Sequence, residues 1–226
     1  MELNILYEDK DILVCEKLPG VPVQSDKTLA PDLVNQLKNY LFEKGETTPY
    51  IGLVHRLDRP VGGVMVFGKT KQATRDLSQQ VQQRQMEKTY LCIVTKELPE
   101  LLEADKMLLT DFLKKDGRTN TSKIVSATDK TGKKAQLYYK VIKVADGCSL
   151  VEVELLTGRH HQIRVQMAAH VAGILGDTKY NVQTEKNGRG KGIALYSNSL
   201  TIMHPKTGKR LTFSNKPQGE YWEKYV

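Results

Sequence analysis

The sequence predicts a protein of the α+β class, built as a single domain on a mostly antiparallel, mixed β-sheet with flanking helices. Three observations predict this class. Strand-like segments outnumber helical ones, turn signals separate neighbouring strands, and no repeat or low-complexity linker interrupts the 226 residues. A chain of this length can bury a substantial core, and we expect one domain spanning residues 1–226.

The elements of the first half follow from the spacing of apolar residues. Residues 32–42 have helical spacing and follow Pro31, which favours a helix start. Residues 71–85 form a second helical pattern, rich in Gln and Arg with a thin apolar stripe, so one side is expected to face solvent. The predicted strands are 3–9, 12–17, 51–57, 64–67 and 86–94.

The second half contains a clear hairpin signal. Residues 135–144 and 149–155 are strand-like and flank Asp146-Gly147, a pair typical of tight turns. Residues 95–122 have only weak signals, with short strand-like pieces and a loop at 114–118. A helix is predicted over 161–172 and a flexible basic loop over 187–192. The last predicted strands are 193–197, 200–203 and 210–213.

Composition limits the class of protein. The three cysteines Cys15, Cys92 and Cys148 are far apart and lie among apolar neighbours, which indicates buried free thiols instead of disulfides or a zinc site. No apolar run approaches the length needed to span a membrane, and the N-terminus lacks a signal-peptide pattern. We therefore expect a cytoplasmic protein.

The net charge of +8 is unevenly distributed. Residues 1–51 carry five Lys/Arg against nine Asp/Glu, whereas residues 114–140 carry eight Lys/Arg against two Asp, and residues 203–216 carry four basic residues and no acidic one. Such basic segments indicate a polyanionic partner, with nucleic acid as the first candidate. A solvated lysine-rich surface is the alternative.

The stretch from His55 to Lys69 places one carboxylate in a rigid setting. His55-Arg56-Leu57-Asp58-Arg59 precedes a Pro-x-Gly-Gly turn, and Val64 to Phe67 follows as an apolar strand. Asp58 is therefore expected between a turn and a strand rooted in the core, where a side chain can be held firmly. An aspartate that merely caps the turn is the alternative.

A second stretch, residues 155–166, reads LLTGRHHQIRVQ. Together the two stretches resemble the RluA family of RNA pseudouridine synthases, whose motifs are H/G-R-L-D with the catalytic aspartate and L-x-T-G-R-x-H-Q-I-R. Further segments that resemble the family in the same order are 11–21, 87–92, 175–180 and 200–208. Two departures are Val61-Gly62-Gly63, where the family has T-S-G, and Gln166, where it has His. Many members also carry a small N-terminal RNA-binding domain, which we expect this chain to lack.

The resemblance implies a pseudouridine synthase fold and an isomerase that converts uridine in RNA to pseudouridine without cofactor or metal. It makes Asp58 the essential group, by attack or by proton abstraction at the ribose. It implies that Arg164 keeps Asp58 charged and that Tyr90 stacks on the flipped uracil. For Arg164 the alternative is a surface helix arginine, and for Tyr90 it is a core tyrosine.

The resemblance also implies RNA as the partner, either ribosomal or transfer RNA, with a stem-loop recognised by a monomer. The residues expected to contact this RNA are His55, Arg56, Arg59, Arg159 and His161. Two other functions stay open. The chain could be an RNA-binding protein that retains the fold without turnover, which the two departures would favour, or, with less support, a hydrolase of free nucleosides.

Overall fold

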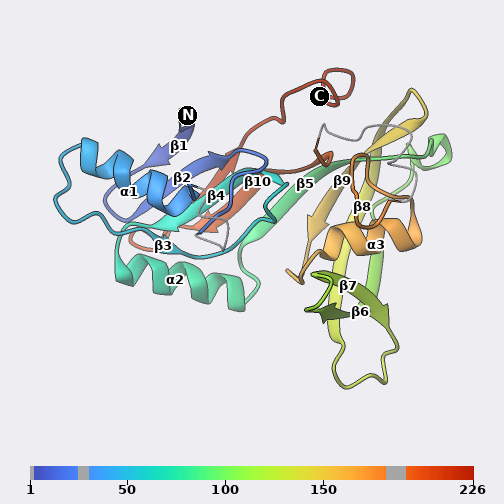
Figure 1. Ribbon diagram of the computed structural model, residues 1–226, viewed down its shortest axis with the longest axis horizontal. Helices are drawn as coiled ribbons and strands as arrows, with labels where there is room; N and C mark the ends of the chain where they lie inside the picture. The colour runs from blue at the N-terminus through green and yellow to red at the C-terminus, as the bar shows by residue number, and fades with distance from the viewer. Residues whose placement is uncertain (1–2, 25–30, 182–191) are drawn as a thin grey trace. The chain divides into compact units, whose positions relative to one another are not determined.

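The computed structural model describes residues 3–24, 31–181 and 192–226 (Figure 1). Contacts within the chain divide it into two compact units. The first unit comprises Met1–Glu87 and Ser197–Lys216, and the second comprises Lys88–Tyr196 and Pro217–Val226. The chain therefore passes between the units three times, once within strand β10 (Leu195–Met203).

The first unit is a small sheet with two α-helices. Its elements are β1 (Ile5–Glu8), β2 (Ile12–Lys17), α1 (Leu33–Glu43), β3 (Gly52–Leu53), β4 (Gly62–Gly68), α2 (Lys71–Gln82), the later part of β10, and β11 (Arg210–Ser214). The strand order is β1-β2-β4-β10-β11, and β3 also pairs with β4. All seven residues of β4 are buried, which marks it as the central strand of this unit.

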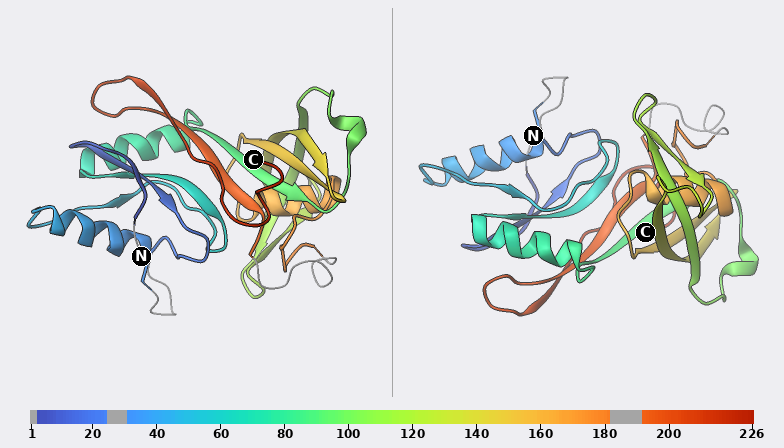
Figure 2. Two further views of the ribbon diagram at one scale, coloured as in Figure 1. Left: turned by 90° about the horizontal axis from the view of Figure 1, so that it is seen from above. Right: turned by 90° about the horizontal axis from the view of Figure 1, so that it is seen from below.

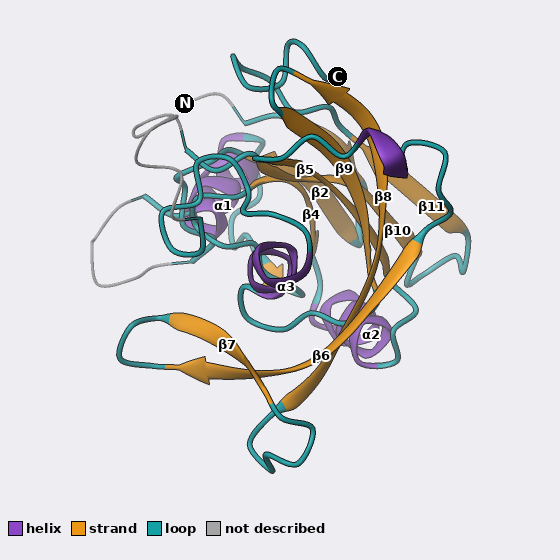
Figure 3. Cartoon of the chain, turned by 90° about the vertical axis from the view of Figure 1, so that its right-hand side faces the viewer, coloured by secondary structure: helices purple, strands orange, loops and turns teal. Residues whose placement is uncertain are grey.

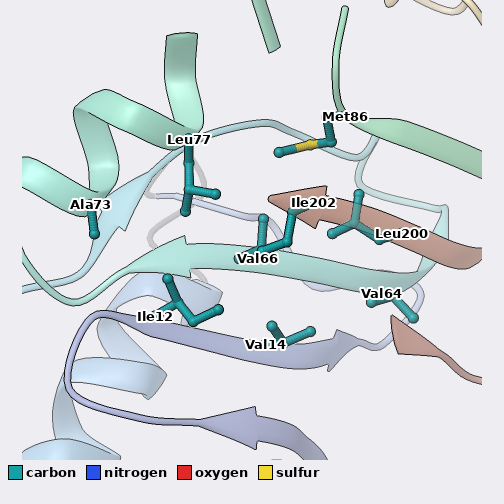
Figure 4. Packing of buried hydrophobic residues seen from close by; sticks show 9 residues of the cluster. All are labelled: Ile12, Val14, Val64, Val66, Ala73, Leu77, Met86, Leu200 and Ile202. Atoms are coloured by element: carbon teal, nitrogen blue, oxygen red, sulfur yellow. The ribbon is translucent and has the colours of Figure 1, made fainter. Parts of the chain in front are cut away.

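Both faces of β2 and β4 are covered. On one face Ile12, Val14, Val64 and Val66 pack against Ala73 and Leu77 of α2 (Figure 4). The alternate residues of the same strands point to the opposite face and are fully buried too. Figure 2 shows α1 on that opposite side. This two-sided burial explains why both strands are almost continuously apolar.

Side-chain caps set the helix starts. Asp32 accepts a hydrogen bond from the backbone N–H of Asn35 (2.9 Å), and Thr70 accepts one from Ala73 (3.0 Å). One glutamine of helix α2 is buried: Gln80 donates to the carbonyl of Met203 (2.7 Å) and accepts from its N–H (2.9 Å). Gln80 thus fastens α2 to β10.

The second unit is an antiparallel sheet with one α-helix against a face. Its elements are β5 (Glu87–Val94, all but its first residue), the 3-10 turn η1 (Pro99–Leu101), β6 (Met107–Asp116), β7 (Thr121–Val125), β8 (Lys133–Ala145), β9 (Cys148–Leu155) and α3 (Gln162–His170). The strand order is β5-β9-β8-β6-β7. Helix α3 lies next to β6 and β7 (Figure 3).

The predicted hairpin around Asp146-Gly147 is confirmed by strands β8 and β9. Asp146 and Gly147 both have positive φ, 51° and 77°, as the mirror-image two-residue turn requires. The C-terminal segment packs beside this turn: the Tyr225 hydroxyl donates to the carbonyl of Ala145 (2.7 Å), and the Trp222 ring meets Tyr196 edge-on at 6.4 Å.

The predicted α+β class and mostly antiparallel sheet are confirmed, since eight strand pairs have an antiparallel register. Three element predictions were wrong. The strand predicted over 51–57 is only Gly52–Leu53, the strands predicted over 193–197 and 200–203 are the single strand β10, and the weak region with its loop at 114–118 contains the ten-residue strand β6.

These errors have a physical origin. Residues 54–57 were expected to pair but lie outside the sheet, and the burial of His55 and Leu57 shows that a buried segment need not be a strand. Over residues 107–114 of β6 the less exposed positions alternate with more exposed ones, so polar side chains occur within a strand. Of the predicted basic loop, only Gly192 lies among the described residues. No helix in the described part of the chain is long and apolar enough to cross a membrane.

Candidate active site

Asp58 lies where the sequence predicted it, at the start of a tight turn before the central strand. The N–H of Val61 donates to the carbonyl of Asp58 (2.9 Å), which closes the turn over Arg59-Pro60. The fully buried strand β4 begins at the next residue. The Asp58 side chain is half-buried, so the backbone around this carboxylate is fixed while the carboxylate itself keeps access to solvent.

A buried lysine supports the same turn. Lys17, at the end of β2, is fully buried, and its Nζ donates to the carbonyls of Leu18 (3.1 Å), Val21 (2.8 Å) and Arg59 (3.0 Å). Burial lowers the pKa of Lys17 to about 7, while the nearby Asp58 carboxylate acts in the opposite direction. Lys17 therefore joins the loop after β2 to the turn that carries Asp58.

The three basic neighbours of Asp58 have different surroundings. Arg56 and Arg59 are exposed, and Arg59 Nε donates to the carbonyl of Gly20 (3.0 Å). His55 is buried, and its Nε2 accepts a hydrogen bond from the backbone N–H of Val66 (3.2 Å). An RNA contact stays a prediction for the two exposed arginines, whereas the surroundings of His55 are those of a residue that anchors the loop to β4.

In the second unit, the Thr-Gly-Arg segment forms the loop that starts α3. Gln162 Oε1 accepts from the Thr157 hydroxyl (2.8 Å) and from the N–H of Arg159 (3.0 Å), while its Nε2 donates to the carbonyl of Gln136 (3.0 Å). His161 at the helix start has a left-handed backbone, φ 54°. This glutamine replaces the usual side-chain cap and fixes where α3 begins.

Arg164 is buried, so the alternative of a surface helix arginine was wrong. Its Nε and one terminal nitrogen donate to the two carboxylate oxygens of Asp177, at 2.8 Å and 2.6 Å. The Asp177 side chain is fully buried and also accepts from the N–H groups of Lys179 and Tyr180. The two-pronged bond uses one edge of the guanidinium and fixes its plane. The predicted pairing of Arg164 with Asp58 stays a prediction.

His161 is held neutral. Burial and the nearby positive charge of Arg164 lower the pKa of His161 to about 3. The hydroxyl of Tyr180 accepts from the N–H of Ser122 (2.7 Å) and is also hydrogen-bonded to Nδ1 of His161 (2.8 Å). A neutral imidazole is a poor phosphate ligand, and this favours a positioning role for the residue.

Two further predicted residues lie in the second unit. Tyr90, on β5, is 6 % exposed. Arg159 is half-buried, and its Nε donates to the carbonyl of Lys134 (2.9 Å), which ties the Thr-Gly-Arg loop to β8. Tyr90 and Arg159 therefore belong to the same unit as Arg164 and His161.

The Val61-Gly62-Gly63 segment and Gln166 each fit their surroundings. Gly63 has φ 129°, and a Cβ there would lie 2.3 Å from the backbone oxygen of Ser197, so only glycine fits. Gln166 is fully buried and donates to Asp111 (2.7 Å), which also bonds to His170 (3.0 Å). Gln166 thus anchors α3 to β6.

A cluster with metal-ligand atoms lies elsewhere in the first unit. Atoms of Asp9, Asp11 and His204 lie within 4.8 Å of one another. His204 Nδ1 accepts from the N–H groups of Lys206 and Thr207, so its proton is on Nε2 and is donated to Asp9 (2.7 Å). Both ring nitrogens are engaged within the protein, and this arrangement serves as a structural bond.

The sequence profile of RNA pseudouridylate synthases matches residues 11–169, more than two thirds of the chain and parts of both units. The chain belongs to the RNA pseudouridylate synthase family. The resemblance noted in the sequence and the predicted isomerase class are confirmed by this membership.

Individual relatives cover most of this pseudouridylate synthase. It is 31% identical over 227 residues to tRNA pseudouridine synthase C of Haemophilus ducreyi, covering 95% of this chain and 90% of that one. It is 28% identical to ribosomal large subunit pseudouridine synthase C of Buchnera aphidicola, covering 99% of this chain but 69% of the relative, so this chain spans about two thirds of that protein. The solved structure of Human RNA Pseudouridylate Synthase Domain Containing 1 has the same fold, with a TM-score of 0.78 at 22% identity over 96% of this chain and 84% of that one.

Sequence reasoning assigned no role to three supporting residues of this pseudouridylate synthase. Lys17, Asp177 and Tyr180 all lie in segments that resemble the family, but only the structure shows Lys17 bound to three carbonyls and Asp177 bound to Arg164. The sequence offered one signal for Lys17: it closely follows the apolar run that ends in Val14-Cys15. That position suggests burial of the side chain but does not identify its hydrogen-bond partners.

Proposed function

We propose that this pseudouridylate synthase isomerises a uridine in a stem-loop of transfer or ribosomal RNA, with Asp58 as the essential group. The observation that carries the proposal is the fixed position of Asp58, between a turn supported by buried Lys17 and the fully buried strand β4. A carboxylate held in this way acts at the same point of every substrate without reorganisation.

In the proposed reaction the N1–C1′ bond of uridine breaks, the uracil turns, and a C5–C1′ bond forms. The proton on C5 leaves, N1 gains a proton, and the product is an isomer of the substrate. Asp58 acts at the ribose, by attack on carbon or by proton abstraction. Both routes require an ionised carboxylate, and a nearby cation favours that form.

Two residues of the second unit have proposed roles. Arg164, with its plane fixed by Asp177, is proposed as a catalytic residue. Tyr90 is the proposed stacking surface for the flipped uracil. Flipping costs a few kcal/mol, and stacking recovers about 1–3 kcal/mol. Phosphate contacts are proposed to supply the remainder, and the exposure of Arg56 and Arg59 supports a part for them in these contacts.

The recognition of RNA is proposed on two grounds. The segment of residues 114–140 carries a net charge of +6, from eight basic and two acidic residues, and relatives that cover most of this chain are named for transfer RNA and for the large ribosomal subunit. A cytoplasmic monomer that needs neither cofactor nor metal stays our prediction.

The test is release of tritium from RNA labelled at C5 of uridine, with unmodified transfer and ribosomal transcripts as substrates. We expect release by the wild type and none by Asp58→Asn. Asp105→Asn, which alters an exposed carboxylate in the second unit, is the matched control and should retain full release. Full activity of Asp58→Asn would refute the mechanism, and tight RNA binding without any release by the wild type would favour an RNA-binding protein that lacks turnover.

A further inference from the structure

Lys88 is a half-buried cation whose protein surroundings supply no anion. It lies at the second position of β5. Among the described residues no hydrogen bond or ion pair to its ammonium group is found, and its neighbour Glu87 pairs with Arg210 instead. Burial lowers the pKa of Lys88, and no carboxylate offsets that effect.

Three other cations of the second unit have partners. Arg164 bonds to the buried Asp177, Lys106 to Glu154, and Lys179 to the carbonyl of Asn120. A partly desolvated charge without a partner destabilises the protein that carries it. A lysine kept in such a position is therefore a candidate for an anion that arrives from outside.

The register of the sheet shows which face Lys88 occupies. Successive side chains of a strand point to opposite faces, so Lys88 and Tyr90 share one face and lie about 6.6 Å apart along the strand. Tyr90 is opposite Val153, which is opposite Tyr139 on β8. Asp111 of β6 lies on this same face, because its partner Ala135 is four residues from Tyr139 on β8.

Helix α3, which carries Arg164, packs against the same face of the sheet as Lys88 and Tyr90. Gln166 of α3 bonds to Asp111, so α3 packs on the face that also carries Tyr90 and Lys88. Arg164 lies on this same helix. A stacking ring and an unpartnered ammonium two residues apart on one strand match a nucleotide, which presents a flat base and a phosphate.

We propose that Lys88 binds a backbone phosphate of the uridine that is isomerised, while Tyr90 stacks on its base. One strand then holds both ends of the flipped nucleotide. The inference rests on the proposed function and adds the residue that receives the phosphate. Phosphate is the charged group of RNA, and a lysine binds it as a point charge with three donors.

The test compares Lys88→Met and Lys88→Arg with the wild type, and Lys143→Met is the matched control because it removes an exposed lysine from the same unit. We measure the affinity for a substrate stem-loop against salt concentration, together with kcat and KM for tritium release. For Lys88→Met we expect KM to rise about tenfold with kcat nearly unchanged. We also expect the slope of log affinity against log salt to become shallower by about 0.7, the value for one single-strand phosphate contact.

The arginine variant and the control should both keep the wild-type salt slope. An unchanged slope and KM for Lys88→Met would overturn the inference and leave the proposed function standing. A fall in kcat with an unchanged slope would also overturn it, since Lys88 would then act on the base or ribose. If the wild type isomerises no RNA, the proposed function fails, while the salt slope of binding still decides whether Lys88 contacts a phosphate.

Discussion

Lys17 shows how much a single buried side chain can hold in place. Its Nζ is the common donor to three carbonyls, one of them on the turn that carries Asp58. Replacement by Met retains the volume but leaves these acceptors unpaired. We expect Lys17→Met to lower the free energy of unfolding by about 1–3 kcal/mol, measured by urea denaturation, and to reduce kcat because Asp58 is less well placed.

The pH dependence of this variant gives a second readout. The pKa of Lys17 is lowered to about 7 in the folded protein from 10.5, so between these values the unfolded chain binds a proton that the folded chain has lost. Stability conferred by Lys17 should therefore rise with pH across this window. We expect the difference in unfolding free energy between wild type and Lys17→Met to increase by about 1.4 kcal/mol per pH unit. A difference that is flat from pH 7 to 10 would contradict this.

At the scale of elements, α3 is positioned by a polar bond inside the second unit. Gln166 donates to Asp111, which lies on β6 and is 9 % exposed. We expect Gln166→Glu to lower the free energy of unfolding by about 3 kcal/mol, because it places a second carboxylate beside a buried one. Thermal and urea unfolding would measure the change.

The matched control exchanges the donor and the acceptor of the Gln166–Asp111 hydrogen bond. In the double variant Gln166→Glu with Asp111→Asn, the amide donates from the strand and the carboxylate accepts on the helix. We expect the double variant to recover most of the lost stability. If it is no more stable than Gln166→Glu alone, the Gln166–Asp111 bond is not what the substitution disrupts.

The sequence predicted elements well where both local signals and burial agreed. Strand 12–17 matches β2 at both ends, and the turn at Asp146-Gly147 was correct because few other residues adopt positive φ at both positions. β6 was missed because it contains many polar side chains. They are compatible with a strand only because β6 pairs with β8, which is distant in the sequence.

The same contrast holds for the candidate site. Asp58 was predictable, because a turn signal and an apolar strand are adjacent to it in the sequence. The ion pair of Arg164 with Asp177 joins a helix to a later turn, and the neutral state of His161 depends on burial and on the positive charge of Arg164. Partners brought together by tertiary structure leave no local pattern, so the sequence could suggest these residues but not their bonds.

In the whole molecule, each unit is built from separate parts of the chain. The C-terminal segment belongs to the second unit, so we expect it to stabilise that unit. Trp222 is 7 % exposed, and its ring contacts Tyr196. We expect Trp222→Ala to lower the free energy of unfolding of the second unit by about 3–5 kcal/mol. Amide hydrogen exchange should show faster exchange in β8 and β9 and little change in β2 and β4. Equal acceleration in β2 and β4 would contradict this assignment.

The three crossings of the chain also bear on how the protein is made. The first unit lacks β10 and β11 until residues 197–216 emerge from the ribosome, and the 109 residues of Lys88–Tyr196 are synthesised in between. At about 5–20 residues per second, this interval is roughly 5–20 s. During that time one edge of β4 has no strand from β10 to pair with. The nascent chain therefore passes through a period in which an apolar sheet edge needs shielding from aggregation.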